Sequence, residues 1–187
     1  MKNLLFYLLL FIPTVSFGQN EHIKFRDIEL NGTILNFVAE LKKLNYSISD
    51  VDYEGTTIVM KGKFIGRDCE LIILSTAKTK TVWKVAVYFK KSNNWLSLKS
   101  DYIALKESLN DKYGKPYKSI ESFSNPYYEG DGNELQAIKK EKCTYATFWR
   151  TYEGYVKLHI TPFCQIAISY EDKINSKIEL KEKSSKL

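Results

Sequence analysis

Two stretches of the chain repeat apolar residues at intervals of three and four, which predicts two amphipathic helices. The first follows an Asn-Gly-Thr turn that can cap a helix, and its apolar positions are Ile34, Phe37, Val38, Leu41 and Leu44. The second has the clearer stripe, which consists of Trp95, Leu98, Tyr102, Leu105, Leu109 and Tyr113. Asn93 or Asn94 can cap it, and Gly114 and Pro116 end it. The aromatic stripe favours packing against a sheet over a ligand-binding role.

The remaining apolar positions alternate with polar ones or form short runs, which predicts strands. The first half has expected strands at 56–64, 69–76 and 81–90. In the last of these, one face would carry Trp83, Val85, Val87 and Phe89, and the other Lys84, Ala86 and Tyr88. The expected strands of the second half are 119–124, 135–139, 144–151, 155–161 and 165–170, the last three as a meander in which Lys157 and His159 face the polar side.

A helix followed by strands thus occurs twice, so we expect an α+β fold with two helices packed on a largely antiparallel sheet. The mature chain would begin at Gln19, and its residues 19–172 have the length of one domain. Its halves, 19–91 and 92–172, allow a pseudo-repeat of helix-plus-strands units joined in one larger sheet.

The first eighteen residues have the anatomy of a signal peptide. Lys2 precedes the apolar run from Leu4 to Val15, and Ser16-Phe17-Gly18 supplies the small residues before an expected cut at Gln19. The run is shorter than the roughly 20 apolar residues that span a bilayer. We therefore expect a secreted or periplasmic protein.

Charge is concentrated near the C-terminus. The chain has a net charge of +6, and residues 173–187 supply half of it with five Lys and two Glu. We expect this Lys-rich segment to be a flexible, solvated tail that can touch an anionic membrane surface weakly. The rest of the chain shows no dense basic face, which argues against a nucleic-acid partner.

Three cysteines in an exported chain favour one disulfide with one thiol left over. Cys69–Cys143 would link equivalent points of the two halves. Cys143–Cys164 follows if residues 153 and 154 form the turn of a hairpin, although Pro162 would interrupt the strand before Cys164. Both pairings remain open, and no Cys-x-x-Cys motif indicates a catalytic thiol.

The loop 124–134 is the most distinctive candidate for binding. Tyr127 and Tyr128 lie beside Glu129 and Asp131, and adjacent aromatic rings can anchor a protein or stack on a sugar. Asp131, together with Asn133 and Glu134, could also offer oxygens to calcium, but the spacing does not match an EF-hand. An ordinary turn is the simplest interpretation of the same residues.

A second acidic cluster contains Asp50, Asp52 and Glu54. Two carboxylates held at a fixed separation can hydrolyse glycosides, although a solvated turn explains the cluster equally well. With only His22 and His159 in the chain, no zinc-ligand spacing, serine-hydrolase elbow or phosphate loop is present. We expect no metal, no cofactor and no catalytic residues.

Several segments carry a resemblance to small secreted α+β proteins of Bacteroidota-type bacteria. They are the Phe17-Gly18-Gln19 cleavage region, the stretch 25–41, Trp83-Lys84-Val85-Ala86-Val87 and Lys112-Tyr113-Gly114-Lys115-Pro116. The layout also resembles, more loosely, the tandem-repeat β-lactamase-inhibitor-like proteins. These likenesses imply export and an α+β fold, and they supply no functional residues.

The sequence therefore favours an exported, non-enzymatic binding module for a protein or an envelope glycan. Recognition would use exposed aromatics on one sheet face or the loop with Tyr127, Tyr128, Glu129 and Asp131. One alternative is a hydrolase with a carboxylate site drawn from Asp50, Asp52, Glu129 or Asp131. Another is a structural accessory of an envelope complex, with the Lys-rich tail against lipid headgroups.

Overall fold

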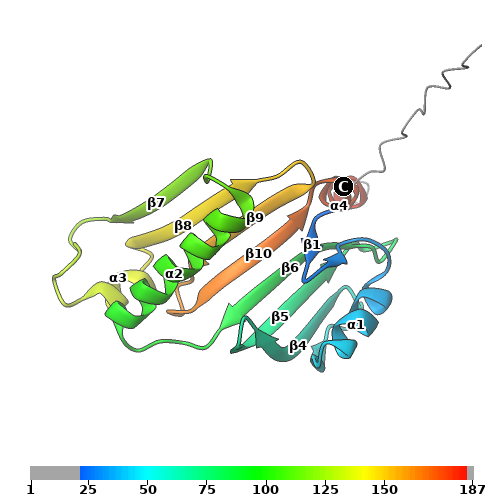
Figure 1. Ribbon diagram of the computed structural model, residues 1–187, viewed down its shortest axis with the longest axis horizontal. Coiled ribbons are helices and arrows are strands. Elements are labelled where there is room, and N and C mark those ends of the chain that lie inside the picture. The colour runs from blue at the N-terminus through cyan, green and yellow to red at the C-terminus, as the bar shows by residue number, and fades with distance from the viewer. Residues whose placement is uncertain (1–21, 185–187) are drawn as a thin grey trace, which may run out of the picture.

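The computed structural model describes residues 22–184, and its centre is one antiparallel sheet of eight strands (Figure 1). The strands lie in the order β3-β4-β5-β6-β10-β9-β8-β7. Their bounds are β3 Ser47–Val51, β4 Thr57–Phe64, β5 Arg67–Ser75, β6 Val82–Phe89, β7 Lys118–Phe123, β8 Cys143–Arg150, β9 Gly154–Ile160 and β10 Ile166–Asp172. A separate two-residue hairpin consists of β1 Lys24–Phe25 and β2 Ile28–Glu29. The α+β class and the antiparallel sheet are confirmed.

The described residues form four helices where two were expected. They are α1 Ile34–Lys43, α2 Trp95–Tyr113, α3 Glu134–Lys139 and α4 Lys173–Ser184. The two predicted helices have the expected ends: the Asn94 side chain accepts a hydrogen bond from Ser97 N, and Gly114 ends α2 with a φ of +75°. The predicted signal peptide and residues 185–187 lie outside the described residues.

The order of elements is a helix and then a meander of four strands, twice over. Helix α1 precedes β3 to β6, and α2 precedes β7 to β10. The last strands of the two meanders, β6 and β10, pair with each other in the middle of the sheet, where Ala86 faces Ser169. Both meanders therefore belong to one continuous sheet.

The core lies between one face of the sheet and helices α1 and α2. Both helices lie on the same side of the sheet in Figure 1. Their apolar stripes pack on strand residues with almost no exposed surface, among them Leu71, Val85, Val87, Leu158, Ile168 and Trp149. At the second helix, Trp95 and Tyr102 both meet the ring of Tyr145 edge-on, with centroids 5.2 and 5.4 Å apart.

A register shift at the start of β6 changes which residues of that strand face the core. Leu74 pairs with Lys84, but the next residue, Ser75, pairs with Val82. As a result Val82 is fully buried and Trp83 is partly exposed, with Lys84 Nζ and the α4 residue Lys183 Nζ over its ring. The prediction that Trp83 shares the inner face with Val85 was wrong because an extra residue in one strand displaces the alternation.

The strand expected at 135–139 is the short helix α3. Its buried residues are Glu134, Ala137 and Ile138, a spacing of three and four that fits a helical turn. The Glu134 carboxylate accepts a hydrogen bond from Gly130 N at 2.9 Å. The sequence interpretation missed this contact, which ties the helix to the preceding loop.

Residues 173–184, expected to be part of a flexible tail, form helix α4. Asp172 caps it by accepting hydrogen bonds from Ile174 N and Asn175 N. The residues that face the protein are polar: Asn175, Glu179 and Glu182 are all at most 8 % exposed. Within residues 22–184, no helix is long and apolar enough to cross a membrane.

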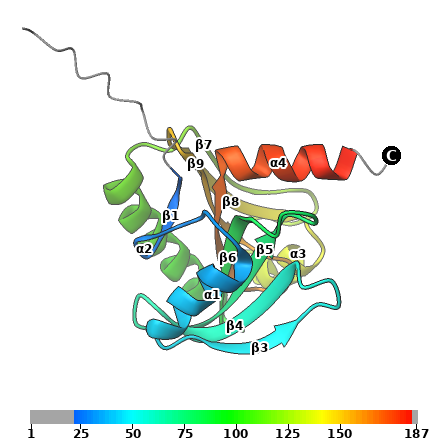
Figure 2. The ribbon, with the colours of Figure 1, turned by 90° about the vertical axis from the view of Figure 1, so that its right-hand side faces the viewer.

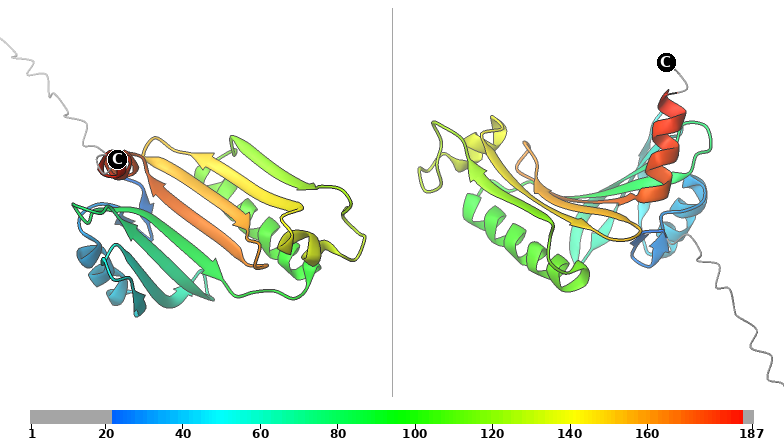
Figure 3. Two further views of the ribbon diagram at one scale, coloured as in Figure 1. Left: turned by 180° about the vertical axis from the view of Figure 1, so that it is seen from behind. Right: turned by 90° about the horizontal axis from the view of Figure 1, so that it is seen from above.

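Helices α3 and α4 lie on the side of the sheet opposite α2 (Figure 2; Figure 3, right). Seen from behind, the central strands between them carry no covering helix (Figure 3, left). This uncovered surface, opposite α1 and α2, is called the open face below.

Candidate functional site

The loop predicted to bind a partner uses its acidic side chains to hold its own shape. Asp131 accepts hydrogen bonds from Tyr128 N at 3.2 Å and from Asn133 N at 2.7 Å. Glu129 forms an ion pair with Lys99 of α2 and accepts a hydrogen bond from Tyr145. These contacts support the simple interpretation of 124–134 as a turn.

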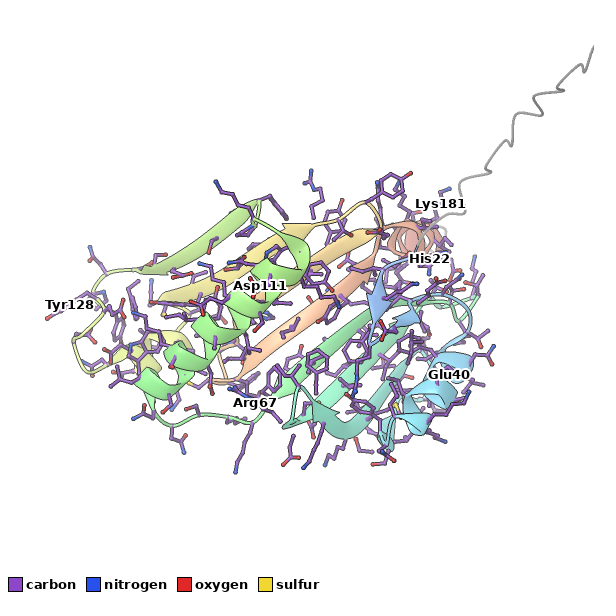
Figure 4. The ribbon with its side chains drawn as sticks, in the orientation of Figure 1. His22, Glu40, Arg67, Asp111, Tyr128 and Lys181 are labelled. Atoms are coloured by element: carbon purple, nitrogen blue, oxygen red, sulfur yellow. The ribbon has the colours of Figure 1, made fainter. Side chains whose placement is uncertain are left out.

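The two tyrosines of this loop differ in exposure. Tyr128 is 65 % exposed and lies at the outer end of the molecule, far from His22 and Lys181 (Figure 4). Tyr127 is partly buried, and its N–H donates to Ser124 O. Only one of the two rings is therefore freely presented for binding.

The second acidic cluster lies at the opposite edge of the sheet. The Asp52 carboxylate accepts hydrogen bonds from Thr56 N, Thr56 Oγ1 and Thr57 N, which close the turn between β3 and β4 and lower the pKa of Asp52. Asp50 lies on the edge strand β3 and accepts a bond from the N–H of Val51. Since β3 and β7 are the two outer strands, Asp50 and Asp52 do not meet Glu129 and Asp131.

No cluster of three or more His, Cys, Asp or Glu residues suited to a metal ion occurs among residues 22–184. The calcium alternative for Asp131, Asn133 and Glu134 gains no support, because Asp131 and Glu134 already accept backbone hydrogen bonds.

Neither predicted disulfide is present, and all three cysteines are free. Cys69 on β5 and Cys143 on β8 have three strands between them, each step adding about 4.8 Å. On β8, Ala146 pairs with His159, so the position opposite Cys143 is Pro162 and not Cys164. Burial raises the pKa of the Cys69 thiol to about 11, which makes it a weak nucleophile.

The open face contains more aromatic and charged side chains than the loop does. Because paired residues on neighbouring strands share a face, the strand registers define three rows across the middle of the sheet. From β5 to β8, the first row is Leu74, Lys84, Glu171, Tyr155 and Arg150; the second is Ile72, Ala86, Ser169, Lys157 and Phe148; the third is Glu70, Tyr88, Ala167, His159 and Ala146.

Cations cover most of the aromatic rings on this face. Lys157 Nζ lies 5.7 Å from the centre of the Phe148 ring, and Lys84 Nζ lies 5.5 Å from that of Trp83. The Arg150 guanidinium lies between two rings, 5.0 Å from Tyr117 and 5.7 Å from Tyr155. Such pairs are attractive and hold long side chains in place.

The middle of the open face is a basic, partly dehydrated region. Burial lowers the pKa of Lys157, and the nearby charge of Lys84 lowers it further. Burial likewise lowers the pKa of His159 to about 4, with further contributions from Lys157 and Lys84. The imidazole is therefore neutral at pH 7, and its Nδ1 is buried without a hydrogen-bond partner among the described residues.

A cleft of about 970 Å³ adjoins the third row. It opens at the end of β4, β5 and β6, beside the C-terminal end of α1, and Lys61, Glu70 and Tyr88 belong both to its wall and to the open face. Gly62 lines the cleft, and the Tyr46 ring packs directly on this glycine, because a Cβ there would lie 2.3 Å from Tyr46 Cδ1. The sequence analysis missed this cleft, since its walls come from six separate segments.

Comparison with known proteins gives no match: no family model fits the chain, and neither a curated protein nor a solved structure is similar to it. The resemblance to small secreted proteins of Bacteroidota-type bacteria stays a prediction.

Proposed function

We propose that the protein is an exported, non-enzymatic binding module and that the open face is its recognition surface for another protein. The single observation that carries the proposal is the collection of partly exposed aromatic and charged residues on an uncovered sheet face. Tyr88, Tyr155 and Phe148 come from three different strands and lie among Lys84 and Lys157. Aromatic residues embedded in a polar surround are typical of protein interfaces.

The geometry of the rings favours a protein over a glycan. A sugar stacks on the flat face of an aromatic ring, and here cations already occupy the ring faces of Trp83, Phe148 and Tyr155. A protein can instead pack on the ring edges and pair with the cations.

The other candidate functions gain less support. A carboxylate-based hydrolase needs two acidic groups in one pocket, whereas Asp50 on the edge strand β3 and Asp131 in the loop after β7 lie at opposite edges of the molecule. For an envelope accessory, α4 offers Lys177 and Lys181 as exposed charges, one helical turn apart. A weak contact of this helix with an anionic membrane, and the secreted or periplasmic location, stay predictions.

The test compares two double variants that each remove two aromatic rings. Mature protein is used to capture partners from native envelope and secreted fractions, together with a Tyr88→Ala/Phe148→Ala variant of the open face and a Tyr127→Ala/Tyr128→Ala variant of the loop. We expect a specific protein to bind the wild type and the loop variant and to be lost from the face variant. Circular dichroism checks that both variants are folded.

A partner that is lost only from the loop variant would contradict the proposal and restore the loop hypothesis. Capture of an oligosaccharide in place of a protein would contradict the choice of partner class.

A further inference from the structure

We propose that the open face receives an aspartate or glutamate side chain of its protein partner, bound between the ammonium groups of Lys84 and Lys157. This inference rests on the proposed function and specifies the chemistry of the partner. It follows from the charges and the burial at the centre of the face.

The acidic residues of the rows are already paired. Glu171 lies 3.4 Å from Lys84 Nζ, and Glu70 lies 3.6 Å from the Nζ of Lys61 on the neighbouring strand β4. Lys157 has no carboxylate within 4 Å among the described residues, and its ammonium group contacts only the Phe148 ring. Cations therefore outnumber anions on the open face, and Lys157 is the central cation that lacks an acidic partner.

Lys157 is also in the position where a carboxylate would stabilise it most. It is half-buried, and burial together with the charge of Lys84 lowers its pKa. Two neighbouring ammonium groups that are partly removed from water repel each other. A carboxylate between them would reverse that repulsion in a region where water screens charge weakly.

The floor beneath the two lysines consists of small residues with little exposed surface: Ala86 is 7 %, Ser169 8 % and Ala167 1 % exposed. Ala86 and Ser169 face each other on β6 and β10, and Ala167 follows in the next row. Longer side chains of the same and neighbouring rows cover them, so an incoming carboxylate meets the ammonium groups of Lys84 and Lys157 and not the strands beneath.

The shape of the region favours a protein side chain over a lipid headgroup. Helices α3 and α4 lie on the same side of the sheet as the open face (Figure 3, right). A flat bilayer would meet these helices before it reached the central strands. A protruding segment of a protein can enter between them.

The experiment begins with selection of random twelve-residue peptides on immobilised mature protein. The best peptide is synthesised, and its affinity is measured for the wild type, for Lys157→Met and for the matched control Lys61→Met, a lysine of the same face that already pairs with Glu70. We expect an acidic peptide that loses affinity about tenfold or more with Lys157→Met and less than about twofold with Lys61→Met.

A second arm replaces the acidic residue of the peptide by its amide. If this residue binds Lys157, the amide peptide and the Lys157→Met variant each remove the same contact. The amide peptide should then bind Lys157→Met with an affinity loss close to that caused by either change alone. Additive losses would overturn the proposed contact.

The outcomes separate this inference from the proposed function. A peptide without acidic residues that still loses affinity with Tyr88→Ala overturns the carboxylate site and leaves the open face as the interface. A peptide whose affinity survives Tyr88→Ala/Phe148→Ala overturns both proposals. Binding to phosphatidylglycerol vesicles that Lys157→Met abolishes would show that the anion is a lipid headgroup and overturn the protein partner.

Discussion

Asp172 gathers polar contacts from two distant segments of the chain. It has no exposed surface, and its carboxylate accepts hydrogen bonds from Ile23 N, Ile174 N and Asn175 N, with His22 Nδ1 3.0 Å away. One side chain thereby joins the first described residues of the chain to the end of β10 and the start of α4.

We therefore expect Asp172→Ala to lower the free energy of unfolding by at least about 2 kcal/mol, because it leaves buried N–H groups without acceptors and removes a helix cap. Urea denaturation followed by fluorescence measures the change. Asp111→Ala, an exposed position on α2, serves as the control and should change stability by less than about 0.5 kcal/mol. Equal effects of the two changes would contradict this role of Asp172.

His159 makes the stability of the fold depend on pH. Its pKa is about 4 in the folded protein because burial, Lys157 and Lys84 disfavour the imidazolium, whereas an unfolded histidine titrates near 6.5. Between these values the unfolded chain binds more protons, so protonation favours unfolding. The resulting loss in the free energy of unfolding is absent above about pH 6.5 and grows as the pH falls toward 4.

We expect this group alone to cost roughly 2 kcal/mol of stability between pH 7 and pH 5. Urea denaturation of the wild type and of His159→Leu at both pH values isolates the effect, since every other titrating group is common to the two proteins. Between pH 7 and pH 5 the wild type should lose roughly 2 kcal/mol more of its free energy of unfolding than His159→Leu does. A difference independent of pH would show that His159 titrates normally.

Among the elements, α4 is held by polar contacts at its ends. Asn175 Nδ2 donates to Leu30 O and Val82 O, and near the other end Glu182 accepts hydrogen bonds from Lys78 N and Thr79 N. Helix α4 therefore holds the turn between β5 and β6 in place through the Glu182 carboxylate.

Loss of the Glu182 carboxylate should release this turn. In Glu182→Ala we expect the amides of Lys78 and Thr79 to exchange with solvent several-fold to about tenfold faster, while the central strands keep their protection. Hydrogen exchange followed by NMR gives the rates residue by residue. Lys181→Ala, one position away and exposed, is the control that should leave both amides unchanged.

The same polar contacts explain why the sequence predicted some elements and not others. Helices α1 and α2 and the central strands bury regular apolar patterns, which periodicity detects. Helix α4 buries Asn175, Glu179 and Glu182, so its inner face resembles a solvated surface in sequence. Helix α3 has only six residues, which is too short for a helical repeat in the sequence to be distinguished from the alternation of a strand.

The candidate site was predictable only in part. Alternation along single strands placed Lys84, Ala86 and Tyr88 on one face and Lys157 and His159 on another, as the structure has them. These two faces form one surface because β6 pairs with β10. The two strands are far apart in the sequence, since β6 ends at Phe89 and β10 begins at Ile166. The cysteine pairing failed for a similar reason, because a hairpin register displaced by two residues moves Cys164 out of position.

At the scale of the whole molecule, the two meanders share one sheet and one core. The buried cluster includes residues of α1 and α2 and of strands on both sides of the β6–β10 pair. Separating the halves would expose β6 and β10 as long apolar edges. The fold should therefore unfold as a single cooperative unit.

Thermal unfolding tests this expectation. The calorimetric and van't Hoff enthalpies should agree, and the fluorescence of Trp83, which belongs to the first half, should change together with that of Trp95 and Trp149 in the second. Single-tryptophan variants with the other two positions replaced by Phe separate the signals. Two distinct transitions would show that the halves are independent domains.

The cation-covered rings of the open face have a further consequence for the entropy of recognition. A free lysine or arginine on a protein surface samples many rotamers, and an interface that fixes it loses that freedom. On this face Lys84, Lys157 and Arg150 are already confined by the rings beneath them before any partner arrives. The entropy cost of ordering these side chains is therefore met during folding and not during binding. A partner should reach a given affinity with a smaller buried area on this face than on a surface of mobile lysines.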